Sequence, residues 1–428
     1  MRFGSRGQLD GGRVAVQQSA PRLYVLDGLR ILAALMVVTF HYVALEGGWG
    51  KNHSEVFPDF RLVARYGWTG VEVFFLISGF VICMSTWGRT LGDFVVSRVS
   101  RIYPAYWVAI FLTAAVVTLW PQTRQVHNWD TVLTNLTMLQ QSVGVWDVDG
   151  VYWTLFIELK FYVLFAIVVA TGVTYRKCVL FCALWTVFAM TATSVDNDML
   201  KMWAMPLFAP YFIAGIAFYL MHRYKPTALL WGIVVLQLLI AQHHVARRVL
   251  DNGDATTPTW PANLIIFIAF VLMALISVGA FNRVQWRWLS TAGALTYPLY
   301  LVHQYIGMTV IYALREAVPA PLLVIGLMVV MLGAAWLMHR YVERPLGKLV
   351  RDALKKSMEE VRRHSAPPAR ARASAQHESA QHENGRHDGV RDGMTLTKRV
   401  PVYEQAGAVR GEHGRPGERV AAGRADGV

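Results

Sequence analysis

Blocks of apolar residues, each about long enough to cross a bilayer, recur along the chain as far as Pro345. A hydrocarbon core of about 30 Å needs roughly 20 mostly apolar residues in one helix. The pattern predicts ten membrane helices, centred near residues 28–46, 68–87, 102–120, 152–171, 178–195, 202–221, 227–243, 261–280, 291–313 and 321–340. The least regular are the seventh, which ends in Gln242 and two histidines, and the ninth, which contains Pro298. The predicted fold class is all-α, a polytopic membrane protein.

Lysine and arginine residues in the loops between these blocks predict the orientation of the chain. If the N-terminus is cytoplasmic, thirteen of them fall on the cytoplasmic side and eight on the other. Cytoplasmic loops carry the excess of basic residues in membrane proteins. We therefore expect both termini to be cytoplasmic, and the protein to lie in the cell (inner or plasma) membrane.

Composition divides the chain into three parts. Charged residues make up 26 of the 78 positions from Arg351 onward, which leaves 43 in the first 350. The first part is too apolar for a small soluble enzyme. We expect a cytoplasmic N-terminal segment at 1–25, a transmembrane domain at 26–348 and a basic tail at 349–428. The tail begins with a short amphipathic continuation to about Arg363, and its composition beyond that predicts disorder.

Charge and cysteine content exclude two other classes of partner. The net charge of +13 is distributed between the apolar blocks, which indicates membrane topology and no binding of nucleic acid. The three cysteines provide neither a disulfide framework nor a tetrahedral metal set. We therefore expect no metal.

Two ionisable residues interrupt the first apolar block. In LDGLRILAALMVVTFHYV, Arg30 and His41 are eleven positions apart, which corresponds to about 16 Å along an α-helix and nearly the same face of it. Ionisable groups within a membrane segment are costly unless they face a cavity or one another. This helix face would carry a cation on the cytoplasmic side and a titratable imidazole farther out. Alternatively, Arg30 is an interfacial anchor neutralised by Asp27, and His41 is an interfacial histidine.

A carboxylate lies in the second block, GVEVFFLISGF. Glu72 is surrounded by apolar residues, and Ser78 with Gly79 would allow a second backbone or a ligand to come close. One interpretation is a functional carboxylate beside a binding site. The other is structural, with Glu72 paired to a buried arginine and the Ser-Gly step packed against another helix.

Another carboxylate lies in the fourth block, WTLFIELKFYVLF, where Glu158 is flanked by the aromatic residues Trp153 and Tyr162. Glu158 would orient or charge-balance His41 if the two helices face each other. Otherwise we expect it to pair with Lys160 or with an arginine of another helix.

An arginine pair precedes the third block, in SRVSRIYPAYW. Arg98 and Arg101 are three positions apart, so in a helix they share one face. Two guanidinium groups there would hold phosphate groups by bidentate hydrogen bonds. On spacing alone, ordinary positive-inside anchoring is the favoured interpretation, because any arginine pair satisfies it. His303, in YPLYLVH, is more typical of a hydrogen-bonded packing residue than of a catalyst.

The order of these segments resembles the acyltransferase-3 family of integral membrane O-acyltransferases. The resemblance runs from about Leu26 to Pro345 and rests on these segments: LDGLR with a histidine eleven positions after its arginine, GVEVFFLISGF, RVSRIYPAYW, WTLFIELKFY, YPLYLVH and the terminal ERP. Threonine stands at 154, where the family usually has serine. Pro298 replaces a common serine, and Leu159-Lys160 replaces a typical Glu-Gln. The length predicts a member without the extra extracytoplasmic domain that some members carry.

The resemblance implies roles for the residues singled out above. The histidine of the first block, His41, would be the catalytic base, and the arginine pair would contact cytoplasmic acyl-CoA, with Arg30 as a further contact. Apart from the resemblance, the analogy with the acid of a serine-protease triad suggests that Glu158 or Glu72 fixes the tautomer of the imidazole. The oxyanion also needs a donor, and the candidates are the side chains of Ser78, Trp153 and Tyr162.

The predicted activity is transfer of an acyl group, acetyl in the commonest case, from acyl-CoA to a hydroxyl group. The acceptor would be an envelope glycan, a lipid-linked sugar or a glycosylated metabolite such as a macrolide. The alternative is a proton-coupled membrane transporter that uses the same buried Arg, His and Glu residues. Internal repeats are common in such transporters, and the sequence shows no duplicated pattern.

Overall fold

The computed structural model describes residues 23–45, 48–50, 53–121, 128–195, 197–253 and 256–365. These residues form helices and connecting turns, with no β-strand among them. The chain divides into two compact units, 1–360 and 361–428, and the description below concerns the first. Most of the predicted N-terminal segment 1–25 and of the predicted tail 349–428 lies outside the described residues.

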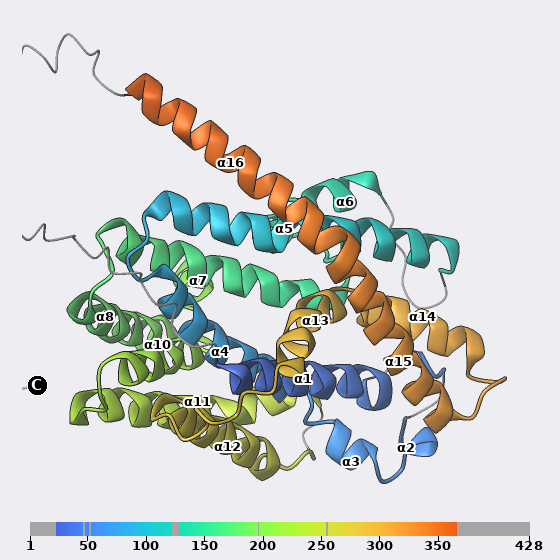
Figure 1. The fold of residues 1–428 in the computed structure, drawn as a ribbon. Helices are drawn as coiled ribbons and strands as arrows, with labels where there is room; N and C mark the ends of the chain where they lie inside the picture. The colour runs from blue at the N-terminus through green and yellow to red at the C-terminus, as the bar shows by residue number, and fades with distance from the viewer. Residues whose placement is uncertain are drawn as a thin grey trace, which may run out of the picture. The chain divides into compact units, whose positions relative to one another are not determined.

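Nine helical segments in the described ranges are long and apolar enough to cross a membrane, by length and composition. This makes the chain a multi-pass membrane protein (Figure 1). The principal helices are α1 (Tyr24–Thr39), α4 (Thr69–Thr86), α5 (Leu91–Leu119), α7 (Trp153–Ala170), α8 (Tyr175–Ser194), α10 (Ala209–Arg223), α11 (Ala228–Asn252), α12 (Trp260–Ser277), α13 (Trp288–Val302), α14 (Gln304–Leu314), α15 (Ala320–Met338) and α16 (Arg344–Ser365). The short helices are α2 (His53–Val56), α3 (Arg61–Ala64), α6 (Trp129–Asn135) and α9 (Asp198–Ala204).

The predicted ninth span, 291–313, is not one continuous helix. It is divided at His303 into α13 and α14, and neither part reaches membrane-spanning length by itself. Pro298, within α13, cannot donate a backbone hydrogen bond, and the helix ends four residues later at Val302. The seventh predicted span is longer than expected, because α11 continues through His243 and His244 to Asn252.

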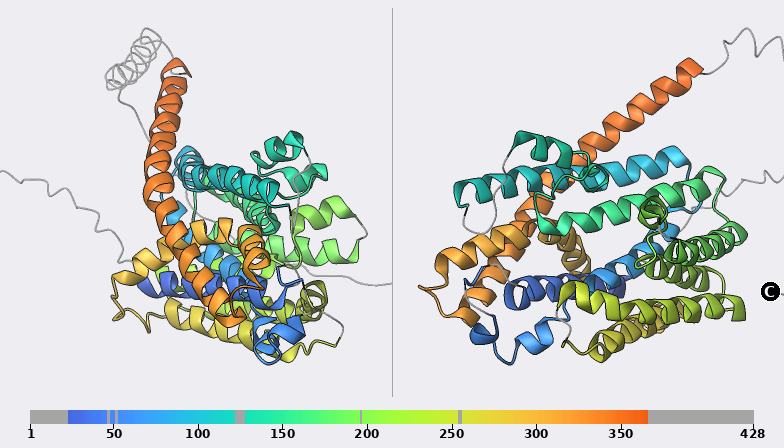
Figure 2. Two further views of the ribbon diagram at one scale, coloured as in Figure 1. Left: turned by 90° about the vertical axis from the view of Figure 1, so that its right-hand side faces the viewer. Right: turned by 180° about the vertical axis from the view of Figure 1, so that it is seen from behind.

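The centre of the bundle is α10, in which every residue from Ala209 to Met221 is buried. It packs along α4, and α4 in turn packs against α1, an arrangement that Figure 2 shows from two further sides. Glycines permit the close approach: a Cβ at Gly79 would collide with the backbone carbonyl of Phe212, and a Cβ at Gly215 with that of Leu76. The Ser-Gly step is therefore a helix-packing site.

Two helices end in a wider π-helical turn. After α1, residues Phe40–Ala44 form the π-helix η1, which contains His41. After α15, residues His339–Glu343 form the π-helix η4, which leads into α16. Single π-helical turns are frequent at functional sites. The amphipathic continuation expected to about Arg363 is helical, so residues 349–365 of the predicted tail belong to α16.

We predict that Gly79→Ala destabilises the protein by about 1–3 kcal/mol, the usual cost of overpacking, because the new methyl group meets the Phe212 backbone. Gly232→Ala in α11 is the matched control, since nothing lies within 4 Å of its added Cβ and alanine favours the helix. The measurement is the thermal unfolding midpoint in detergent. Equal midpoints for the two variants would contradict the close packing of α4 on α10.

Candidate active site

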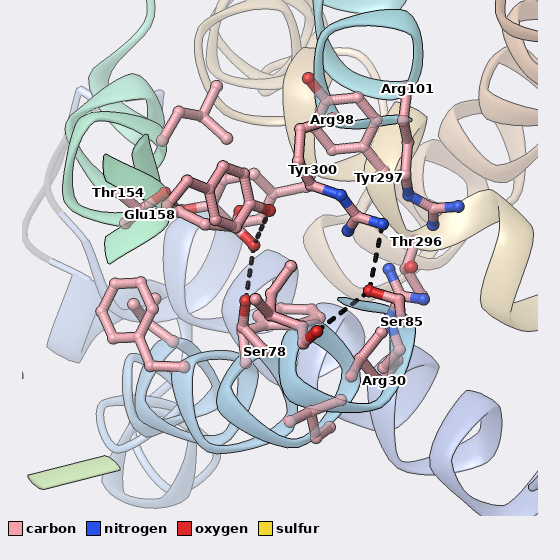
Figure 3. A pocket seen from close by; sticks show the side chains of 18 residues that line it. Arg30, Ser78, Ser85, Arg98, Arg101, Thr154, Glu158, Thr296, Tyr297 and Tyr300 are labelled. Atoms are coloured by element: carbon pink, nitrogen blue, oxygen red, sulfur yellow. Dashed lines mark hydrogen bonds between the residues drawn. The ribbon is translucent and has the colours of Figure 1, made fainter. Parts of the chain in front are cut away.

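A cavity of about 340 Å³ opens between α1, α4, α5, α7 and α13. Figure 3 shows the side chains that line it. Much of the lining is apolar, contributed by Val71, Phe74, Phe75, Ile77, Val81, Ile82 and Leu155. Its charged residues are Arg30, Arg98, Arg101 and Glu158. Three guanidinium groups against one carboxylate give the cavity a net positive charge, which suits an anionic ligand.

The three arginines come from two helices. Arg98 and Arg101 share one face of α5, as their spacing predicts, and Arg30 reaches the same cavity from α1. Figure 3 shows their guanidinium groups gathered on one side. The Arg98 Nη2 atom donates to the hydroxyl of Ser85 at 3.3 Å and to that of Ser97 at 3.2 Å. Its Nε atom is buried without a hydrogen-bond partner in the described part of the chain.

On the other side of the cavity, Glu158 is held by two hydroxyl groups. Its Oε1 atom accepts a hydrogen bond from Ser78 at 2.7 Å and another from Tyr162 at 2.5 Å. Lys160, an alternative partner in the sequence analysis, donates instead to the backbone carbonyl of Met202 at 2.8 Å. Glu158 therefore belongs to the arginine-lined cavity.

His41 has a different partner from those expected. Its Nδ1 atom lies 2.9 Å from Nε2 of His303, and the two ring centroids are 4.9 Å apart. The Nδ1 atom of His303 lies 2.9 Å from the backbone carbonyl oxygen of Tyr300. The structure brings neither Glu158 nor Glu72 into hydrogen-bond contact with the His41 ring.

Glu72 forms a buried ion pair with Arg248 of α11. Its Oε1 atom accepts hydrogen bonds from Nη2 at 2.8 Å and from Nε at 2.9 Å. Three rings surround the guanidinium carbon, those of Trp68 at 5.2 Å, Trp153 at 5.7 Å and Phe208 at 5.0 Å. Of the two interpretations of Glu72, the structure therefore shows the one in which it pairs with a buried arginine. Trp153 belongs to the same cluster and is not among the residues that line the cavity.

Tyr300 connects the cavity to the histidine pair. Its side chain lines the cavity, and its hydroxyl group is hydrogen-bonded to the Thr154 hydroxyl at 2.8 Å. The centroid of its ring lies 5.7 Å from that of the His303 ring. His41 itself is partly accessible and is not one of the lining residues. The arginine-lined cavity and the His41 imidazole are thus separated by the Tyr300–His303 layer.

Asp149 fixes the helix break next to this layer. Its carboxylate accepts from the backbone N–H of Val151, before α7, at 3.3 Å and from that of Tyr305, in the first turn of α14, at 3.1 Å. The carboxyl is fully buried. Burial raises its pKa to about 7, with a smaller contribution from the nearby charge of Asp147.

Several of these contacts have no counterpart among the predictions from the sequence. His303 is fully buried and hydrogen-bonded, as predicted for a packing residue, and its spacing from Tyr300 places both on one helical face. Arg248 was counted only among the loop cations, because α11 was expected to end before it. No sequence signal marks Asp149 as the link between α7 and α14, since the contact spans 156 positions.

A family model described as an acyltransferase domain, acyltransferase 3, matches residues 23–340. The exopolysaccharide production protein ExoZ of Rhizobium meliloti is 31% identical over 176 residues, which cover 38% of this chain and 54% of ExoZ. No solved structure matches the chain with significance.

Two further relatives are named for peptidoglycan. The putative peptidoglycan O-acetyltransferase YrhL of Bacillus subtilis is 27% identical over 172 residues, covering 36% of this chain and 24% of that protein. The peptidoglycan O-acetyltransferase OatA of Listeria monocytogenes is 27% identical over 164 residues, covering 33% of this chain and 24% of OatA. The matched part of the chain spans about half of ExoZ and about a quarter of the other two relatives.

We predict that Asp149 makes the protein less stable as the pH rises. Its folded-state pKa of about 7 lies above the ordinary value of about 3.9, so the folded state binds this proton more tightly than the unfolded chain. The resulting stability is fully present below about pH 4 and is lost as the pH rises through about 7.

The thermal unfolding midpoint in detergent, measured at pH 5 and pH 8, tests this. The midpoint of the wild type should fall more between these values than that of Asp149→Asn, which cannot ionise. Asp130→Asn removes an exposed carboxylate and should keep the wild-type pH dependence. A wild-type slope in Asp149→Asn would refute the assignment.

Proposed function

The chain belongs to the acyltransferase-3 family, and on that premise we propose that it transfers an acyl group from cytoplasmic acyl-CoA to a hydroxyl of a sugar-containing acceptor. The observation that carries this proposal is the clustering of Arg30, Arg98 and Arg101 around one cavity. We further propose the cell membrane as its location, with both termini in the cytoplasm.

The cavity suits the chemistry of acyl-CoA. The donor carries phosphate groups at one end and a thioester at the end of a long, weakly polar arm. Guanidinium groups bind phosphate through charge-assisted, often bidentate hydrogen bonds. The apolar lining from α4 and α7 suits the arm and the acyl group. Glu158, fixed by Ser78 and Tyr162, limits the positive charge of the cavity.

In the proposed reaction, His41 is the general base. Its imidazole takes the proton of the acceptor hydroxyl as that oxygen attacks the thioester carbonyl. The carbon–sulfur bond then breaks, and the departing thiolate receives the proton from the imidazolium. The products are the acyl ester and free coenzyme A, with no net proton gained or lost. In this scheme the thioester passes the Tyr300 ring to reach His41. For Ser78 or Tyr162 to donate to the oxyanion, its single hydroxyl hydrogen would have to turn away from Glu158, to which it donates in the structure.

Relatives support the choice of acceptor. ExoZ is named for exopolysaccharide production, and YrhL and OatA for O-acetylation of peptidoglycan. A hydroxyl on an envelope glycan, a lipid-linked sugar or a glycosylated metabolite is therefore the acceptor class that we propose. The family match also favours an enzyme over the proton-coupled transporter, which would use the same buried residues without releasing coenzyme A.

We predict that Arg98→Ala raises the KM for acetyl-CoA about 10- to 100-fold, the value of one or two lost hydrogen bonds to a charged group. Arg101→Ala should act in the same direction. Arg89→Ala, an exposed arginine between α4 and α5, is the matched control and should leave KM unchanged. The assay is acetyl-CoA-dependent release of coenzyme A by membranes that contain the protein. An unchanged KM in both cavity variants would remove the basis for a phosphate-bearing donor.

We predict that His41→Ala abolishes acyl transfer while the protein still inserts and folds. The test is mass spectrometry of glycans and small metabolites from cells with the wild type, with His41→Ala and without the protein. A mass gain equal to one acyl group should appear with the wild type only. Transfer that persists in His41→Ala, at equal protein in the membrane, would reject His41 as the base.

A further inference from the structure

We propose that His303 is a positioning residue that sets the tautomer of His41 and stabilises its protonated form. This inference rests on the proposed role of His41 as the base. Its starting point is a hydrogen-bonded chain of three groups, in which His41 Nδ1 meets His303 Nε2 at 2.9 Å and His303 Nδ1 meets the Tyr300 carbonyl oxygen at 2.9 Å.

The Tyr300 carbonyl at the end of this series of hydrogen bonds determines which nitrogen of each imidazole carries a hydrogen. A carbonyl oxygen only accepts hydrogen bonds, so Nδ1 of His303 must carry a hydrogen. Burial of the ring, which has 0% exposure, favours its neutral form, because a charge there would lose its hydration. In a neutral imidazole the other nitrogen, Nε2, then accepts. His41 must therefore donate from Nδ1, which leaves the lone pair on its Nε2 atom.

The two histidines are consequently not interchangeable. Both ring nitrogens of His303 are engaged, and its ring is fully enclosed. His41 is a partly accessible residue, and in this arrangement its Nε2 atom carries the basic lone pair. Only His41 is in a position to meet a substrate hydroxyl, whereas His303 acts through it.

The surrounding structure holds His303 in place from both sides. Tyr42, which follows His41 in η1, donates from its hydroxyl to the backbone carbonyl of His303 at 2.8 Å. Two residues after His303, in the first turn of α14, the backbone N–H of Tyr305 donates to the Asp149 carboxylate at 3.1 Å. In this proposal, the break between α13 and α14 at His303 places the His303 ring beside His41.

This arrangement matters most when His41 is charged. When its Nε2 atom takes the acceptor's proton, the ring becomes an imidazolium, and its Nδ1–H donates to the neutral Nε2 of His303. Hydrogen bonds from a charged donor are roughly twice as strong as neutral ones. The contact is therefore stronger in the transition state than in the resting enzyme, which is the condition for an effect on kcat.

The first test compares His303→Leu with His303→Gln in the full-length protein in nanodiscs, with [¹⁴C]acetyl-CoA as donor and lipid and glycan extracts of the native host as acceptor. Gln retains an acceptor oxygen near the position of Nε2, and Leu does not. We expect His303→Leu to lower kcat about 10- to 100-fold, as loss of an orienting partner commonly does, with the KM for acetyl-CoA unchanged. His303→Gln should recover most of the loss.

Two kinetic outcomes would overturn the proposal: wild-type kcat in His303→Leu, or equal losses in the Leu and Gln variants with a matching fall in thermal stability. The proposed function fails separately, if His41→Ala retains activity.

A second measurement needs no His303 variant. In ¹⁵N-histidine NMR of the wild-type protein, with the His41 signals assigned by their loss in His41→Ala, we expect protonated Nδ1 and unprotonated Nε2. The opposite tautomer at His41 would overturn the proposal.

Discussion

A charged or strongly polar side chain among apolar helices must find its partner within the protein, because the bilayer offers none. This constraint organises the interior of the molecule. Glu72 is paired with Arg248, Glu158 is held by two hydroxyl groups, and His41 contacts a second histidine. The contacts of Glu72 with Arg248, of Glu158 with Ser78 and of His41 with His303 each join segments that are distant in sequence. These polar residues therefore also determine which helices meet.

The three polar groupings differ in what they leave available. Glu72 and Arg248 are almost fully buried and enclosed by aromatic rings, so this pair joins α4 to α11 and has little capacity for a ligand. The arginine-lined cavity has three guanidinium groups against one carboxylate, and so a surplus of positive charge. In the arrangement proposed above, the histidine pair leaves one basic nitrogen, Nε2 of His41. The proposed function thereby gives binding and proton transfer to separate groups on the two sides of Tyr300.

Close packing and helix breaks create this separation. Glycines on α4 and α10 allow the two backbones to touch, and another face of α4, with Ser78 and Ser85, lines the cavity. The π-helical turn at Phe40–Ala44 and the break at His303 place both imidazoles where regular helices would not. The cost of these irregular turns is offset locally, for example by the Tyr42 hydrogen bond to the His303 carbonyl.

The sequence by itself determined the all-helical membrane class, most of the spans, the shared face of Arg98 and Arg101 and the acyltransferase-3 resemblance. These follow from local apolar runs, helical periodicity and short motifs, which act over one or a few turns. The partners of Glu72, Glu158 and His41 were decided only by the tertiary structure. Contacts such as His41 with His303 span 262 positions, and they depend on how α1, α4, α7 and α13 pack, on a π-helical turn and on a helix break. None of these has a periodic signature in the chain.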